Sequence, residues 1–137
     1  MTVRPFAEAD RDAAEAVLAA CFDYPTAYNA PAASIRRKAA AADGLFWVAE
    51  DGGAVVGTVM AGWDGHRGWI YSLGVLPGHR GSGIGTALMR RALDELAARD
   101  CPKVNLQVVE GNRGVVDFYA RLGFKVEERI SMGRVTP

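Results

Sequence analysis

The feature that most constrains the fold is a glycine-rich stretch, Arg80-Gly81-Ser82-Gly83-Ile84-Gly85, which lies between an apolar run and a helical pattern. The apolar run, residues 69–76, suits a strand, and Pro77 ends it because proline has no N–H for a ladder or a helix interior. The glycines allow a tight turn and a close approach to a ligand, and the first N–H groups of the following helix have no helical partners. Those donors and the helix dipole favour an anion, so the stretch predicts a phosphate-binding loop.

Two common phosphate loops do not match this stretch. A P-loop requires Gly-Lys followed by Ser or Thr, and no lysine occurs between Gly53 and Lys103. A dinucleotide-binding loop requires Gly-x-Gly-x-x-Gly and an acidic residue roughly 20 residues later, at the end of the second strand. The third glycine of that spacing is replaced by Thr86, and the strand pattern at residues 103–109 is followed by an acid only at Glu110.

The remaining pattern, Arg80-x-x-Gly83-x-Gly85, resembles the pyrophosphate-binding signature of the GNAT superfamily of acyl-CoA-dependent N-acetyltransferases. A second stretch resembles the family's other signature, in which Asn112 opens a short helix that carries Phe118-Tyr119 and ends at Gly123-Phe124. The two stretches follow in the family's order and spacing, and the resemblance covers essentially the whole chain. Residues 57–60, Asp64-Gly65-His66-Arg67-Gly68 and Cys101-Pro102-Lys103 carry a narrower likeness, which is to small bacterial GNAT proteins whose substrates are unassigned.

Composition is consistent with one small enzyme domain over residues 1–137. Sixteen basic and sixteen acidic side chains give a formal charge of zero, which argues against nucleic acid or an anionic membrane as a partner. The sequence has no N-terminal signal segment and no apolar run of about 18 residues, so we expect a cytoplasmic protein. Cys21 and Cys101 lack the number and spacing of a disulfide framework or a metal site, so we expect reduced thiols and no metal.

The expected order of elements is β-α-α-β-β-β-α-β-α-β. Strands are predicted at residues 3–6, 45–50, 54–63, 69–76, 103–109 and, as one or two strands, 124–134. Helices are predicted from Asp10 to about residue 21, from Ser34 to about residue 42, from about Ile84, and after Asn112, with Asp10 and Ser34 as caps. This order suits an α+β protein, and the resemblance implies the GNAT fold, a mixed central sheet flanked by helices.

The resemblance implies acetyl-CoA as the cosubstrate, with its pyrophosphate at the glycine-rich loop and its pantetheine arm between two splayed parallel strands. A backbone N–H of Gly74 or Val75 would polarise the thioester carbonyl, and Gly74 would permit the bulge that frees this N–H. Asn112 either contacts the pantetheine or only caps its helix. The residues implied in cosubstrate binding are Leu73, Gly74, Val75, Arg80, Gly81, Ser82, Gly83, Ile84, Gly85, Thr86, Asn112 and Tyr119.

Tyr119 is implied as the general acid, because its phenol can donate to the departing CoA thiolate. From spacing alone, Val115, Tyr119 and Leu122 also fit a helical core stripe, and the surrounding signature favours the catalytic interpretation. The base is open. Many family members have a glutamate on the strand before the loop, but Tyr71 stands at the matching position. Glu110, Asp64 and His66 are the candidates, acting directly or through water, and Glu110 leads because it ends a predicted strand.

The expected acceptor is an amine of a small molecule, a peptide or a protein. Residues 23–31 are predicted to be an irregular segment. Aromatic residues in such a segment or at a strand end often wall a pocket. The substrate-side candidates are Tyr24, Tyr28, Trp63, Asp64 and His66. The acceptor, the acyl-chain preference and the oligomeric state, including a homodimer, stay open. The alternative function is a catalytically inert acyl-CoA-binding regulatory module on the same fold, and a nucleotide-dependent oxidoreductase ranks third.

Overall fold

The computed structural model describes residues 1–24 and 26–137, which divide into an N-terminal unit, Met1–Leu106, and a C-terminal unit, Gln107–Pro137. The prediction of an irregular segment at residues 23–31 includes residue 25, which lies outside the described residues. The expectation of a single domain stays a prediction. In the N-terminal unit the elements are β1 (Thr2–Pro5), α1 (Arg11–Cys21), α2 (Pro31–Ala41), β2 (Phe46–Asp51), β3 (Ala54–Trp63), β4 (Gly68–Val75), α3 (Ile84–Ala98) and β5 (Val104–Asn105). The C-terminal unit contains α4 (Arg113–Arg121).

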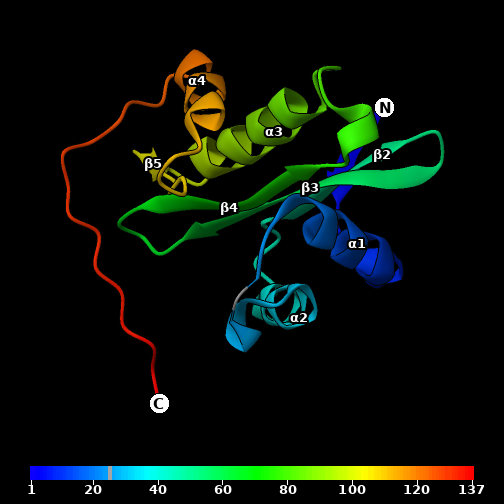
Figure 1. Cartoon of the computed structure of the whole chain (residues 1–137), viewed down its shortest axis with the longest axis horizontal. Helices are drawn as coiled ribbons and strands as arrows, with labels where there is room; N and C mark the ends of the chain where they lie inside the picture. The colour runs from blue at the N-terminus through cyan, green and yellow to red at the C-terminus, as the bar shows by residue number, and fades with distance from the viewer. Residues whose placement is uncertain (25) are drawn as a thin grey trace. The chain divides into compact units, whose positions relative to one another are not determined.

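The strands form one mixed sheet in the order β1-β2-β3-β4-β5 (Figure 1). Neighbouring strands from β1 to β4 are antiparallel, whereas β5 lies parallel to β4. The β4 to β5 pairing is short and joins Gly68 to Val104 and Trp69 to Asn105. The α+β class and the mixed sheet flanked by helices are therefore confirmed.

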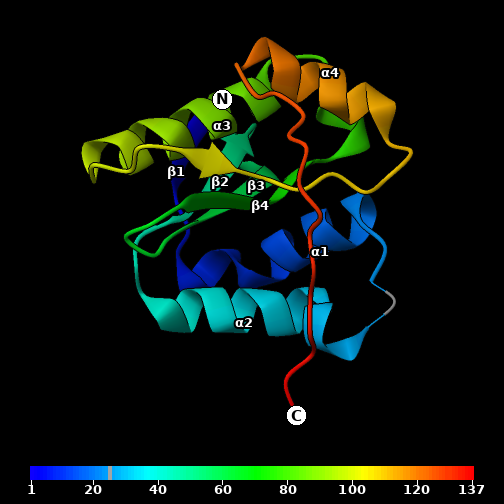
Figure 2. The same ribbon diagram turned by 90° about the vertical axis from the view of Figure 1, so that its left-hand side faces the viewer.

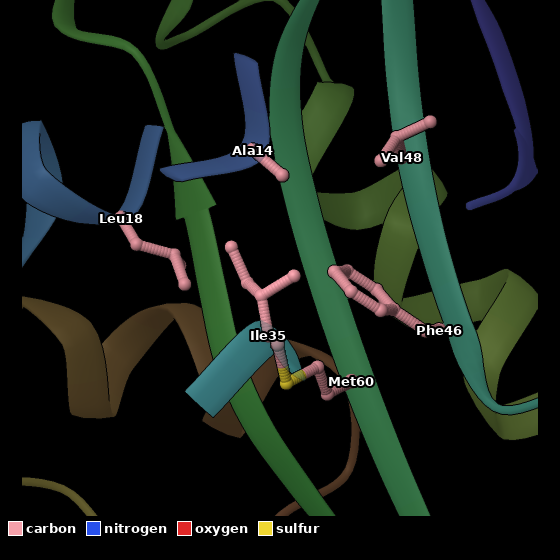
Figure 3. Packing of buried hydrophobic residues seen from close by; sticks show 6 residues of the cluster. All are labelled: Ala14, Leu18, Ile35, Phe46, Val48 and Met60. Atoms are coloured by element: carbon pink, nitrogen blue, oxygen red, sulfur yellow. The ribbon is translucent and has the colours of Figure 1, made fainter. Parts of the chain in front are cut away.

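Helices cover both faces of this sheet. Figure 2 shows α1 and α2 on one face and α3 on the other. On the first face, Leu18 of α1 and Ile35 of α2 pack against Met60 of β3 (Figure 3), and the cluster is completed by Ala14, Phe46 and Val48. On the second face α3 buries Ile84, Leu88, Met89, Ala92 and Leu96. Each large apolar side chain that is fully buried contributes roughly 1.5–3 kcal/mol, so the two layers hold the sheet from both sides.

Several sequence predictions are confirmed where the signal is local. Strand β3 has the predicted bounds, and α3 begins at Ile84. The turn between β2 and β3 has Gly52 and Gly53 at φ +59° and +82°, as the hairpin signal requires.

Of the two predicted helix caps, Asp10 takes the N-cap position of α1 without making a capping bond, and Ser34 is wrong. The Asp10 carboxylate makes no capping bond to α1, because it binds the Arg4 guanidinium and the Ala7 N–H instead. Ser34 lies inside α2, and its N–H donates to Ala30 O at 2.9 Å. Helix α2 begins earlier, at Pro31, because the fixed φ of proline suits the first helical position and proline has no N–H to satisfy there.

Two predicted strands also differ from the structure. The strand expected at residues 103–109 is reduced to Val104–Asn105, and none of the described residues 124–134 is in a strand. An alternating pattern such as that at Phe124 and Val126 forms a strand only where a neighbouring strand pairs with its backbone. No strand occurs among the residues of the C-terminal unit, so this alternation has no ladder to join there.

Separately, no helix among the described residues combines the length and the apolar composition of a membrane span.

A partly buried ion pair joins β1 to the start of α1. Asp10 is 7% exposed and accepts from both terminal nitrogens of Arg4, at 2.8 and 2.9 Å, and from the Ala7 N–H at 2.8 Å. The Arg4 guanidinium also reaches Glu50 at 3.4 Å. The bonds from Arg4 are the main cause that lowers the pKa of Asp10 below its usual value.

We predict that Asp10→Asn lowers the free energy of unfolding at neutral pH by about 1.5–3 kcal/mol, the range for hydrogen bonds to charged groups. Because the folded pKa lies below the unfolded value of about 3.9, this stabilisation is present above about pH 4 and is lost as the pH falls through the folded pKa. Urea denaturation at several pH values should therefore show a difference between wild type and variant that shrinks below about pH 4.

Glu8→Gln is the control, because Glu8 pairs with Arg11 at 2.9 Å on an exposed surface. It should leave the unfolding free energy nearly unchanged. Equal losses in the two variants would mean that the pair of Arg4 and Asp10 is not specifically stabilising.

Candidate functional site

The candidate site begins at an open edge of β4. Beyond Trp69, the edge of β4 that faces away from β3 has no strand partner among the described residues of the N-terminal unit. The Leu76 N–H donates to Val56 O at 2.8 Å, so position 76 faces β3. Because backbone groups alternate between the two edges of a strand, the N–H and C=O of Val75 face the open edge.

A β-bulge interrupts β4 beside this edge. Thr58 lies opposite Gly74 and Met60 lies opposite Tyr71, so Ser72 and Leu73 together face the single residue Val59. Ser72 has φ +53°, a left-handed conformation that costs roughly 1–2 kcal/mol for a residue with a Cβ. The hydroxyl of Thr58, which is fully buried, donates to Ser72 O at 2.9 Å and holds the bulge.

This geometry corrects the predicted role of Gly74. The bulge lies at Ser72 and Leu73, and Gly74 remains paired with Thr58. By the alternation along β4, the N–H of Gly74 faces β3, so Val75 is the one of the two predicted donors that faces the open edge. Gly74 instead lets the end of α1 come close to β4, because a Cβ at position 74 would lie 3.1 Å from Cys21 Sγ and 3.3 Å from Phe22 Cε2.

The glycine-rich loop follows β4 after a short 3-10 helix, Pro77–His79. Gly81 and Gly83 have φ values of +80° and +87°, which side chains rarely adopt, and a Cβ at either position would meet no atom within 4 Å. The glycines are thus required by the backbone and face open space. The Ser82 hydroxyl donates to His79 O at 2.7 Å, so it braces the loop from within.

The loop leads directly into the N-terminus of α3, a helix of 15 residues. The Ala87 N–H makes a helical bond to Gly83 O at 3.0 Å, so the N–H groups of Ile84, Gly85 and Thr86 precede the helical ladder. These donors, with the positive end of the helix dipole, form a site suited to an anion. The predicted phosphate-binding residues 81–86 are therefore brought together.

The Arg80 side chain has a different direction from the one that its signature suggests. Its Nε donates to Val75 O at 2.9 Å, and its Nη2 lies 3.7 Å from Cys21 Sγ. The exposed guanidinium is therefore directed at the end of β4. The open edge, the loop and the α3 N-terminus together can bind an extended chain of amides that ends in a phosphate.

The C-terminal unit holds the predicted acid. Tyr119 lies near the end of α4, and its ring makes edge contacts with Phe118 at 5.1 Å and Phe124 at 5.8 Å. The Phe124 N–H donates to Tyr119 O at 3.1 Å, which folds the Gly123-Phe124 pair back onto the helix. Burial raises the pKa of Tyr119, so its phenol stays protonated at neutral pH.

Asn112 and Glu110 precede α4 in the same unit. Asn112 occupies the N-cap position, but its side chain makes no capping hydrogen bond. Glu110 is exposed and lies in a turn, whereas β5 already ends at Asn105. The prediction that Glu110 ends a strand is therefore wrong, because the ladder to β4 stops early; its role as a base stays a prediction.

The other two base candidates lie in the turn between β3 and β4. The N–H groups of Arg67 and His66 both donate to Asp64 Oδ1 at 2.8 Å. These two bonds, that of Arg67 first, lower the pKa of Asp64, so its carboxylate is a weaker base than a free one. His66 is exposed, and its Nε2 lies 3.5 Å from Arg67 Nη2.

The aromatic candidates are divided between two segments. Trp63 ends β3 opposite Gly68, while Tyr24 packs against the α1, α2 and β3 cluster. Tyr28 lies in a short 3-10 helix and is 53% exposed. Tyr71 was noted in the sequence only because it stands where a glutamate is expected. It lies on β4 opposite Met60 of β3 and is 54% exposed. Burial of its phenol, with a smaller effect from the Asp64 charge, raises the pKa of Tyr71.

Sequence reasoning missed Thr58, Cys21 and the exposed Tyr71. None belongs to a motif, and each gains its place from strand register or from the approach of α1 to β4. Among the described residues, no group of at least three His, Cys, Asp or Glu side chains could hold a metal ion.

Comparison with known proteins gives a consistent picture. A family model described as the acetyltransferase (GNAT) family matches residues 11–124. An acetyltransferase from Trypanosoma brucei is 25% identical, with a TM-score of 0.72 over 98% of this chain and 99% of that one. AAC(6')-Iy, in complex with the bisubstrate analogue CoA-S-monomethyl-acetylneamine, is 16% identical, with a TM-score of 0.81 over 99% and 98%. The ribosomal-protein-S18-alanine N-acetyltransferase of Escherichia coli is 20% identical, with a TM-score of 0.74 over 90% and 77%.

We predict that Thr58→Val lowers the free energy of unfolding by about 1–3 kcal/mol, because a methyl group in place of the buried hydroxyl leaves Ser72 O without its donor. Thr58→Ser is the matched control, since it keeps the hydroxyl and loses about 0.8 kcal/mol for one methyl group. Amide hydrogen exchange at Ser72 and Leu73 should accelerate in Thr58→Val alone. Equal acceleration in both variants would show that packing, and not the hydroxyl, holds the bulge.

Proposed function

We propose that this chain, which belongs to the acetyltransferase (GNAT) family, transfers an acetyl group from acetyl-CoA to an amine by direct attack of the amine on the thioester. The observation that carries the proposal is the open edge of β4, which continues through a glycine loop to the N-terminus of α3. Positioning a thioester beside an amine can remove up to roughly 7–11 kcal/mol of the barrier, so a site that aligns the two is itself a catalyst.

The residues present fit an acyl-CoA. The N–H groups of Ile84, Gly85 and Thr86 would bind the pyrophosphate, and each negative charge near a helix N-terminus gains about 0.3–1 kcal/mol. Gly81 and Gly83 face open space, so no side chain obstructs that approach. The amides of the pantetheine arm would pair along the open edge of β4, with Leu73 among the proposed partners. When bound, acetyl-CoA supplies the activated acyl group.

Two groups would act on the reacting carbonyl and on the leaving thiol. The Val75 N–H on the open edge would donate to the carbonyl oxygen as negative charge develops there. Tyr119 would donate its phenolic proton to the departing thiolate, and its raised pKa keeps that proton in place at neutral pH. Asn112, whose side chain does not cap α4, would be free to contact the pantetheine.

The proton of the amine would leave by a distributed route. Tyr71 stands where a carboxylate would serve, and its raised pKa keeps it neutral. Water ordered near Glu110, Asp64 or His66 would then accept the proton, or the enzyme would bind the neutral fraction of the amine. Glu110 is the leading single base if one dominates.

The acceptor is an amine of a small molecule, a peptide or a protein. Solved structures of this fold support that class, since one holds CoA-S-monomethyl-acetylneamine and another acetylates an alanine of a ribosomal protein. Tyr24, Tyr28, Trp63, Asp64 and His66, joined by the exposed Tyr71, are the proposed substrate-side residues. A single domain over residues 1–137, a cytoplasmic location and the absence of nucleic-acid and membrane partners remain part of the proposal.

The second candidate is an inert acyl-CoA-binding regulatory module, which Tyr71 in place of a carboxylate favours. Turnover separates the two functions. A screen of small amines, peptides with free N-termini and lysine-containing peptides for acetyl-CoA-dependent thiol release should give at least one substrate. Tight CoA binding without thiol release from any class would support the regulatory module.

We predict that CoA and acetyl-CoA raise the thermal stability of the protein, by roughly 2.7 kcal/mol at about 100 times the dissociation constant, and that NAD and ATP do so much less. Gly83→Glu should remove most of this shift, because its side chain would enter the phosphate space and repel the ligand. Gly65→Glu is the matched control: Gly65 has the same φ, +87°, and an equally open position, in the turn between β3 and β4. An unchanged shift in folded Gly83→Glu would place the pyrophosphate elsewhere.

We predict that Tyr119→Phe lowers kcat by about 10²–10⁴-fold, the usual range for general acid–base catalysis, with little change in acetyl-CoA affinity. The variant keeps the ring contacts with Phe118 and Phe124, so a stability loss should be small. The measurement is single-turnover kinetics, in which chemistry limits the rate. Full activity under those conditions would make Tyr119 a packing residue.

We predict that kcat/KM rises through the alkaline range and that alanine at Glu110, Asp64 or His66 singly lowers it by less than about 100-fold, below a full base contribution. Asp64, with its lowered pKa, is ionised throughout this range and cannot cause an inflection there. A plateau above a sharp pKa that disappears in one alanine variant would refute the distributed route and identify the base.

A further inference from the structure

Two side chains meet on one backbone carbonyl at the mouth of the open edge. Val75 O accepts from Arg80 Nε at 2.9 Å and from Cys21 Sγ at 3.4 Å. Arg80 Nη2 in turn lies 3.7 Å from Cys21 Sγ, so the three groups close a triangle. The carbonyl belongs to β4, the thiol to the last residue of α1 and the guanidinium to the glycine loop. This cluster, which we call the Val75 clamp, therefore joins the end of α1, the strand and the loop.

The clamp acts on the residue whose N–H faces the open edge. The bond from Leu76 N–H to Val56 O fixes the alternation, so the N–H and C=O of Val75 point to the same edge. The N–H belongs to the peptide group before Val75 and the C=O to the one after it, and the two meet at the Val75 Cα. Two donors from other elements that hold the carbonyl therefore restrain the backbone at Val75, which also carries the N–H.

Gly74 allows the end of α1 to lie close enough to β4 for Cys21 to contact Val75 O. A Cβ at Gly74 would lie 3.1 Å from Cys21 Sγ and 3.2 Å from Cys21 Cβ, closer than most side chains tolerate. Glycine at 74 thus lets α1 bring the thiol onto the carbonyl of the next residue. Cys21 is half-buried and reduced, and its partner Arg80 is exposed at the edge of the loop.

We propose that Cys21 and Arg80 are positioning residues of the transfer reaction, which hold Val75 so that its N–H faces the thioester, and that the Arg80 side chain serves the strand and not the pyrophosphate. The proposal rests on the proposed function for its kinetic consequence. The phosphates are then bound by the backbone N–H groups at the start of α3. Loss of the clamp should consequently lower kcat while CoA affinity is retained.

The test compares Cys21→Ala, Arg80→Met, Arg80→Lys and the double variant Cys21→Ala/Arg80→Met. Lysine keeps the positive charge but lacks the planar fork that reaches both the carbonyl and the thiol. We expect kcat to fall about 5–50-fold in each single variant, Arg80→Lys included, with the CoA dissociation constant by calorimetry within about 3-fold of wild type. The double variant should lose less than the product of the single losses, because the two donors share one acceptor.

Cys101→Ala is the matched control. Its thiol also lies 3.4 Å from a backbone carbonyl, that of Lys103, in the segment between α3 and β5 and outside the proposed catalytic machinery. It should keep wild-type kcat. A Cys21→Ala variant with wild-type kcat would overturn the proposal. A phosphate-binding role for Arg80 would appear as CoA affinity lost at least 10-fold in Arg80→Met and largely kept in Arg80→Lys, and would also overturn it.

A readout without turnover separates this proposal from the proposed function. In the free protein, the Val75 amide resonance should shift in Cys21→Ala and in Arg80→Met and stay in place in Cys101→Ala. An unshifted Val75 resonance in both clamp variants would refute the clamp. Wild-type protein that turns over no amine would refute the proposed function, while the resonance experiment would still decide on the clamp.

Discussion

The early end of the ladder between β4 and β5 is the constraint on which the candidate site depends. The two strands pair only at Gly68 with Val104 and at Trp69 with Asn105. Beyond this point β4 keeps its antiparallel neighbour on one edge, and the backbone groups on its other edge have no strand partner among the described residues of the N-terminal unit. A longer ladder would satisfy those groups within the sheet and leave no donor for an extended ligand. The open edge is therefore what makes β4 the proposed binding surface.

Elements far apart in the sequence keep this edge in shape. The bulge at Ser72 and Leu73 stores strain, and the buried Thr58 hydroxyl on β3 offsets it. On the same strand, Gly74 admits the end of α1, so that Cys21 reaches the carbonyl of Val75. The core beneath, with Leu18, Ile35 and Met60, fixes α1 and α2 against the sheet. Packing thus determines the direction of single backbone groups at the site.

The sequence predicted best what local chemistry decides. The loop glycines and the start of α3 follow from backbone conformations that only glycine adopts easily and from the apolar period of one helix. Asp10 takes the predicted N-cap position but makes no capping bond, because its carboxylate binds Arg4 from another element. The range 124–134 was predicted as strand although pairing depends on a neighbour. Thr58 was missed because its contact with β4 depends on strand register, which a motif does not encode, and Cys21 because the packing of α1 brings it to β4.

The most direct test of the central claim is an amide resonance titration of the isotope-labelled protein with CoA. If the open edge of β4 and the N-terminus of α3 bind the ligand, the largest shifts should fall on the N–H groups of Val75, Ile84, Gly85 and Thr86. Amides of β1 and β2, which lie across the sheet, should change little. Saturable binding that leaves those four resonances in place and shifts other parts of the chain would contradict the account.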